Sequence, residues 1–127
     1  MIYLDTSAFL KTVWQEPESA ALSRAIGDKP TVSSALLAVE ARRSTLRVAA
    51  DQLPRTDLML ADVNQIELTP ALLESASRLP DPMLRSLDAI HLATALLIRE
   101  EVDVLLSYDQ RLLDAAAEHG LPTAAPA

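Results

Sequence analysis

The stretch Ile2-Tyr3-Leu4-Asp5-Thr6-Ser7 opens with an apolar run and ends in an aspartate followed by two hydroxyl residues. A short apolar run with this ending is typical of a buried strand that leads into a helix. A carboxylate beside buried positions is costly unless a partner compensates its charge. We therefore expect residues 2–4 to form a first strand and Asp5 to be a candidate functional residue.

The rest of the chain alternates short apolar runs with longer segments of helical periodicity. This alternation is typical of an α/β protein with a parallel sheet. We predict further strands at residues 30–33, 65–68 and 102–107, and helices at residues 7–14, 17–26, 33–50, 57–64, 69–78, 86–101 and 110–119. The tail from 121 to 127 has weak strand propensity and two prolines. Without a repeat or linker, residues 1–127 read as a single domain.

Composition narrows the classes of function. The 127 residues carry 11 Lys and Arg against 18 Asp and Glu, a net charge of -7, which argues against nonspecific coating of nucleic acid. Only two glycines are present, too few for a glycine-rich phosphate loop. There is no cysteine, no signal-peptide pattern and no apolar run of the roughly 18 residues that a membrane span needs. We expect a cytoplasmic protein without a membrane segment.

Three further acids resemble Asp5 in lying beside apolar positions: Glu40, Asp88 and Asp109. Asp5 and Asp109 each follow a predicted strand, and ligands of open α/β sheets bind beyond the carboxyl ends of the strands. Carboxylate oxygens suit Mg²⁺ or Mn²⁺. Such an ion polarises a phosphoryl oxygen and lowers the pKa of a bound water. The four acids together therefore indicate a metal site for phosphate chemistry.

Each acid also has an ordinary structural interpretation. Asp5 could cap the first helix, and Asp109 could cap the last one. Glu40 could form a surface pair with Arg43 three residues later. Asp88 could interact with the dipole at the start of its helix. These alternatives are weaker for the four acids together, because a solvated face is not expected at positions flanked by apolar residues.

Four segments in order resemble the motifs of the PIN domain, and more narrowly those of the small VapC toxins of type II toxin–antitoxin pairs. They are Tyr3-Leu4-Asp5-Thr6-Ser7-Ala8, residues 34–43 around Glu40, residues 84–95 around Asp88, and residues 106–116 around Asp109. The segment around Asp88 is the most specific match. Ser107 stands where relatives often have threonine.

This resemblance implies a three-layer α/β/α fold with a central parallel sheet of four to five strands. It implies an Mg²⁺- or Mn²⁺-dependent endoribonuclease that hydrolyses RNA phosphodiester bonds and acts as a toxin. Asp5 and Asp88 would be the principal metal ligands, and Glu40 and Asp109 would complete the catalytic site directly or through waters. The resemblance also implies a homodimer and a VapB-type antitoxin that blocks the site.

Other residues near these motifs are candidates for substrate contact. Thr6 and Ser7 would lie beside the site and could bond to Asp5 or to a phosphate. Arg85, three residues before Asp88, is the favoured arginine for binding RNA among five candidates. We interpret His91 as a satisfied helix histidine, with a role beside the acidic site as the alternative.

Rival functions remain open from the sequence. A haloacid-dehalogenase-type phosphotransferase also begins with a strand and an aspartate, but it needs an acid at position 7, which is serine here. A catalytically silent PIN-like RNA-binding module is disfavoured because all four acids are present. A structure-specific DNA nuclease could use the same metal site, although the small size of the chain favours RNA.

Overall fold

The computed structural model describes all residues, 1–127, and contains one sheet of five parallel strands in the order β3-β2-β1-β4-β5. The strands are β1 Ile2–Leu4, β2 Thr31–Ser34, β3 Val63–Ile66, β4 Val104–Leu106 and β5 Thr123–Ala124. The helices are α1 Thr6–Val13, α2 Ser19–Ile26, α3 Leu36–Val48, α4 Leu53–Leu60, α5 Pro70–Ser77, α6 Ser86–Leu97 and α7 Gln110–Glu118. None of them has both the length and the apolar character needed to cross a bilayer.

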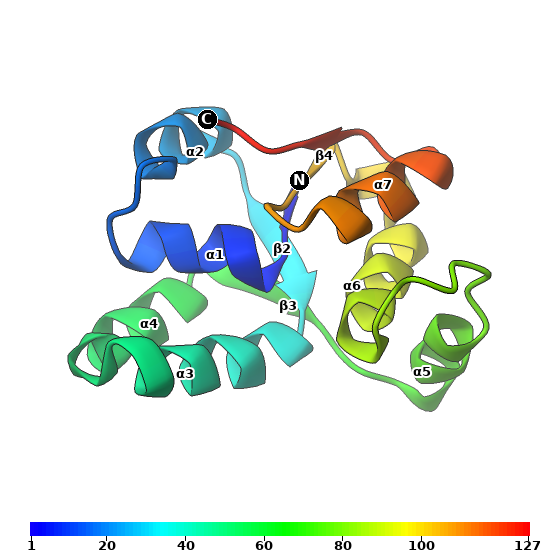
Figure 1. Cartoon of the computed structure of the whole chain (residues 1–127), viewed down its shortest axis with the longest axis horizontal. Coiled ribbons are helices and arrows are strands. Elements are labelled where there is room, and N and C mark those ends of the chain that lie inside the picture. Colours follow the sequence, from blue (N-terminus) through cyan, green and yellow to red (C-terminus); the bar gives the residue numbers. More distant parts are fainter.

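Helices cover both faces of the sheet. Figure 1 shows α1, α3 and α4 on one side of the strands, and α5, α6 and α7 on the other. Successive side chains of a strand point to opposite faces. In β1, Ile2 and Leu4 accordingly pack in one cluster with residues of α1 and α2, whereas Tyr3 packs in another with Leu92 and Leu112 of α6 and α7. The predicted three-layer α/β/α arrangement with a parallel sheet is confirmed.

The first strand of the chain is the central strand of the sheet. β1 pairs with β2 on one side and with β4 on the other, so Tyr3 lies opposite both Val32 and Leu105. The chain builds the β2 side first and then crosses to the β4 side, which makes the β1–β4 boundary the point where the strand order reverses. Ligand sites of open α/β sheets lie at such a point, and Asp5 follows β1 directly there.

Several predicted boundaries differ from the structure by a few residues. β3 begins at Val63 rather than residue 65, in register with Thr31 of β2. α4 begins at Leu53 rather than residue 57, because proline is tolerated in the first turn of a helix and Pro54 does not break it. α6 ends at Leu97, and a short 3₁₀ turn, Arg99–Glu101, follows it where the helix was predicted to continue.

The tail, for which the sequence left a strand open, forms the short edge strand β5 despite its prolines. The N–H of Leu105 donates to the carbonyl oxygen of Pro122, 2.8 Å away, and the N–H of Ser107 donates to that of Ala124, 3.2 Å away. Proline lacks a donor but keeps its carbonyl acceptor, so it is compatible with an edge strand. The sheet therefore has five strands.

Candidate acidic site

Asp5 is buried, with 4% of its surface exposed, at the junction of β1 and α1. Its Oδ1 accepts hydrogen bonds from the Ala8 N–H at 2.9 Å and from the Ser7 hydroxyl at 2.7 Å. Its Oδ2 accepts from the Ser107 hydroxyl at 2.5 Å. Burial raises the pKa of Asp5 above its usual range, and these three donors oppose the rise only in part. Asp5 therefore caps α1, as the structural interpretation expected. Its burial also disfavours the charged form, which is not the case for a solvent-exposed capping residue.

Ser107 connects the two acids that follow strands. Its hydroxyl donates to Asp5 and accepts from the Asp109 N–H at 2.9 Å. Asp109 in turn caps α7, because its Oδ1 accepts from the Arg111 N–H at 3.0 Å. Asp5 and Asp109 were predicted to lie at the same edge of the sheet. The Ser107 hydroxyl links them there, because it bonds to the carboxylate of Asp5 and to the backbone N–H of Asp109.

Glu40 reaches the same edge from the second turn of α3. Its Oε1 accepts from the Thr6 hydroxyl at 2.6 Å and lies 2.7 Å from Nε2 of His91. Burial tends to raise the pKa of Glu40, but hydrogen bonds from His91 and Thr6 outweigh it and hold the pKa below its usual range. The alternative surface pair with Arg43 does not form: Glu40 has an ion pair only with His91.

His91 is almost fully buried on α6, and both of its ring nitrogens have partners. Nδ1 lies 2.8 Å from the hydroxyl of Tyr3, and Nε2 faces Glu40. Burial also raises the pKa of Tyr3, which keeps its hydroxyl protonated. His91 is thus both the satisfied helix histidine and the neighbour of the acidic site. Tyr3 had no sequence signal beyond an apolar strand position.

Asp88 lies half-buried in the first turn of α6, as predicted. Burial raises the pKa of Asp88, and the negative charges of Asp109, Asp5 and Glu40 raise it further, while His91 acts in the opposite direction. The structure therefore brings all four predicted acids into one electrostatic neighbourhood. No lysine or arginine forms an ion pair with any of them.

These carboxylates fit a hard divalent cation. Apart from the pair between Glu40 and His91, these like-charged oxygens have no lysine or arginine to compensate them, and a divalent ion would provide that compensation. No group of three or more His, Cys, Asp or Glu side chains is close enough to form a complete cage. Mg²⁺, however, usually keeps several waters and binds through only one or two carboxylates. The donor set therefore suits an open, partly hydrated ion.

The residues predicted to contact substrate differ in whether their side chains already form hydrogen bonds. The Ser7 hydroxyl bonds to Asp5 as expected, whereas the Thr6 hydroxyl donates to Glu40 instead of Asp5. Both hydroxyls are therefore engaged in holding the acids. Arg85 is exposed at the start of α6, and its side chain forms no capping hydrogen bond and no ion pair.

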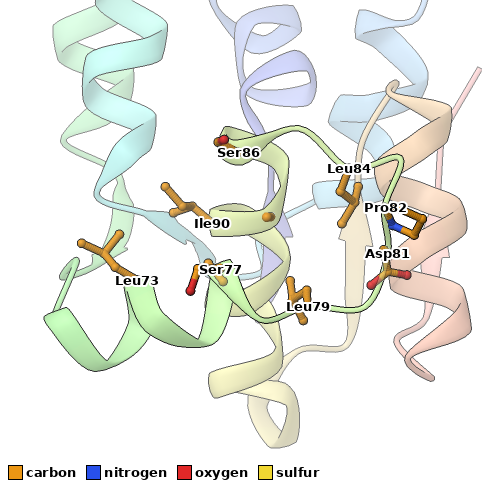
Figure 2. A pocket seen from close by; sticks show the side chains of 10 residues that line it. Leu73, Ser77, Leu79, Asp81, Pro82, Leu84, Ser86 and Ile90 are labelled. Atoms are coloured by element: carbon orange, nitrogen blue, oxygen red, sulfur yellow. The ribbon is translucent and has the colours of Figure 1, made fainter.

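A cavity of about 320 Å³ lies on another side of α6, between α5 and the segment that joins the two helices. Figure 2 shows Ile90 and Ser86 of α6 beside it, with Leu73 on α5 and Asp81, Pro82 and Leu84 on the joining segment. None of the four acids lines it. The cavity is therefore separate from the acidic site.

Replacing Ser107 with alanine should lower the stability of the protein at neutral pH by about 1–3 kcal/mol, because a buried carboxylate oxygen of Asp5 loses its donor. Ser107→Thr keeps the hydroxyl and serves as the matched control. Urea unfolding at pH 7 and near pH 4 measures the effect. The loss should shrink at the lower pH, because a larger fraction of Asp5 is protonated there when its pKa is raised by burial. Equal midpoints for the two variants at pH 7 would contradict the assigned role of Ser107.

The geometry agrees with what comparison with known proteins shows. The PIN domain family profile matches residues 2–118. "Ribonuclease VapC35" of Mycobacterium tuberculosis is 39% identical over 131 residues, covering 99% of this chain and 97% of the relative. "Ribonuclease VapC46" of the same organism is 39% identical over 126 residues, covering 98% and 97%. The chain belongs to the PIN-domain family, and within that family to the VapC group.

Solved structures share the fold. A toxin–antitoxin complex from Klebsiella pneumoniae contains a chain that superposes with a TM-score of 0.77 at 22% identity, covering 100% of this chain and 98% of that one. VapC20 of Mycobacterium tuberculosis, described as a Sarcin-Ricin loop cleaving toxin, gives a TM-score of 0.75 at 17% identity, covering 99% and 100%. At these identities the likeness establishes the fold.

Proposed function

We propose that this chain is a metal-dependent endoribonuclease that acts as the toxin of a type II toxin–antitoxin pair. The observation that carries the proposal is the position of Asp88, whose pKa is raised by burial and by the charges of Asp109, Asp5 and Glu40. Residues that concentrate negative charge in this way, without a lysine or arginine in an ion pair, are typical of a functional site. Membership in the VapC group supports ribonuclease activity as the use of that site.

Each acid has a distinct part in the proposed reaction. Asp5 and Asp88 would hold Mg²⁺ or Mn²⁺, with Glu40 and Asp109 completing the site directly or through waters. The ion would supply polarisation of the phosphoryl oxygen and a water of lowered pKa. Arg85 would bind a phosphate of the RNA strand, which offsets the net charge of -7 locally. Glu40 would orient the attacking water through a carboxylate oxygen.

The partners of the proposed toxin follow from its relatives. One solved relative is a toxin–antitoxin complex, and another is VapBC2 from Rickettsia felis bound to a DNA fragment from the promoter. We infer that this chain, too, pairs with a VapB-type antitoxin that blocks the acidic site, and that it forms a homodimer. We infer that it acts in the cytoplasm, because RNA and such an antitoxin would be its partners.

The proposal is tested with purified, antitoxin-free protein and a defined RNA mixture, with and without Mg²⁺ or Mn²⁺. Asp88→Asn is measured beside the wild type, and Asp51→Asn, at an exposed position in the 3₁₀ turn Ala50–Gln52, is the matched control. We expect metal-dependent cuts by the wild type and by Asp51→Asn, and none by Asp88→Asn. Equal cutting by Asp88→Asn, or preferential cutting of DNA of the same sequence, would refute the proposal.

A further inference from the structure

The two oxygens of the Glu40 carboxylate have unequal surroundings. Oε1 accepts from the Thr6 hydroxyl at 2.6 Å and faces Nε2 of His91 at 2.7 Å. The structure shows no hydrogen bond to Oε2. An ionised carboxylate offers about four acceptor sites on two oxygens, so the two donors occupy one oxygen and leave the other available.

The bond to Glu40 determines which ring nitrogen of His91 carries the proton. An ionised carboxylate can only accept a hydrogen bond, so Nε2, 2.7 Å from Oε1 of Glu40, carries the proton in this bond. In the neutral ring Nδ1 is then an acceptor, and the Tyr3 hydroxyl, 2.8 Å away, is its donor. Tyr3 is completely buried and cannot exchange this partner for water. In the neutral ring the hydrogen bonds therefore run in one direction, from Tyr3 through His91 to Glu40.

We propose that His91 is a positioning residue for the nuclease site: with Thr6 it holds Oε1 of Glu40, so that Oε2 alone faces the metal ion, water or substrate. This inference rests on the proposed function, since it assigns Glu40 a part in that site. A residue that orients a ligand from behind typically changes metal affinity or activity by about 10- to 100-fold when it is replaced.

The helix α6 carries both His91 and the candidate ligand Asp88. His91 and Asp88 are three residues apart on α6, and residues at this spacing are neighbours on one face of a helix. Glu40 comes from α3, on the opposite side of the sheet (Figure 1). The bond between His91 and Glu40 therefore joins the two helices at the site and sets the separation of two of its carboxylates.

A magnetic resonance measurement tests the bond itself, without metal or RNA. The chain has only two histidines, so long-range ¹H–¹⁵N spectra of ¹⁵N-histidine-labelled protein contain two rings, and His119→Asn assigns them. We expect a proton on Nε2 of His91 at pH 7, in the neutral ring or the imidazolium. A neutral ring protonated only on Nδ1 could not donate to Glu40 and would overturn the proposal.

Two substitutions then test the consequence. His91→Gln keeps a donor near the position of Nε2, whereas His91→Leu fills a similar volume without one. We expect His91→Leu to weaken Mn²⁺ binding, measured by calorimetry, and RNA cleavage by about 10- to 100-fold, and His91→Gln to recover most of both. Each variant is first checked for a native near-ultraviolet circular dichroism spectrum.

The outcomes separate this inference from the proposed function. Wild-type protein that is folded, carries the proton on Nε2 and fails to cut any RNA contradicts the nuclease proposal while the bond to Glu40 stands. Wild-type cleavage with equal Mn²⁺ affinity and equal rate in folded His91→Leu contradicts the positioning role alone. Equal losses in His91→Gln and His91→Leu also contradict it, because a purely structural histidine would not be rescued by an amide donor.

Discussion

Asp5→Asn should abolish metal-dependent RNA cleavage, with a loss of at least about 100-fold, because this buried carboxylate is a proposed principal ligand and removing even an outer partner of a metal site costs up to that much. The same substitution should leave the metal-free fold intact. Asparagine keeps an oxygen that can accept from Ala8 N–H and Ser7, so the cap of α1 survives.

The stability of the wild type should respond to pH in a direction set by Asp5. Because its folded pKa is raised, the native state prefers the protonated carboxyl. That preference stabilises the fold below the unfolded pKa of about 3.9, and it is lost as pH rises through the folded pKa. Asp5→Asn has no charge to bury, so at neutral pH it should be at least as stable as the metal-free wild type.

Chemical unfolding of both proteins between pH 4 and pH 8 in a chelating buffer checks this expectation. Asp51→Asn, exposed in the turn before α4, is the matched control for the amide substitution. The stability gap between Asp5→Asn and the wild type should widen in favour of the variant as pH rises. A variant that is less stable than the wild type at pH 8 would show that the buried charge stabilises the fold without a cation.

Mn²⁺ at about 100 times its dissociation constant should raise the midpoint of thermal unfolding by roughly 8 °C. Binding to the native state alone at that concentration contributes about 2.7 kcal/mol, and a chain of this size shifts by roughly 3 °C per kcal/mol. The physical reason is that the ion neutralises Asp5 and Asp88, whose pKa values are both raised by burial, and for Asp88 also by neighbouring carboxylates.

Thermal scans of wild type, Asp88→Asn and Asp51→Asn with Mn²⁺, and with NaCl at matched ionic strength, isolate the specific effect. The shift should persist in Asp51→Asn, fall sharply in Asp88→Asn and be absent with NaCl. An equal Mn²⁺ shift in wild type and Asp88→Asn would place the bound ion away from the acidic site.

The architecture was predictable because each strand and helix carries a local signal. Strand β1 ends where the apolar residues give way to Asp5. The helical periodicity of apolar residues after Ser86 indicates α6. The wrong start of β3 and the open question of β5 arose where local signals are weak or conflict with strand pairing. Val63 joins β3 because Thr31 lies opposite it, and the weakly apolar Thr123 joins β5 because Leu105 offers a free edge. Neither partner is visible in the local sequence.

The sequence predicted that four acids lie near one another, but it did not predict their hydrogen bonds. Acids beside apolar positions indicated Asp5, Glu40, Asp88 and Asp109, and the charges of the other three act on Asp88 in the structure. The contact between Glu40 and His91 spans 51 residues, and that between Tyr3 and His91 spans 88. Only the packing of α3 and α6 around β1 creates these contacts, so spacing along the chain could not reveal them.

The central strand β1 is synthesised first, but its neighbour β4 is synthesised about a hundred residues later. Ser107, which donates to Asp5, is made 102 residues after it. At ribosomal rates of roughly 5–20 residues per second, about 5–20 s separate the synthesis of Asp5 from that of Ser107. A nascent chain that stops before Val104 lacks β4, Ser107 and Asp109 together. The acidic site can therefore assemble only after Ser107 and Asp109 have been synthesised.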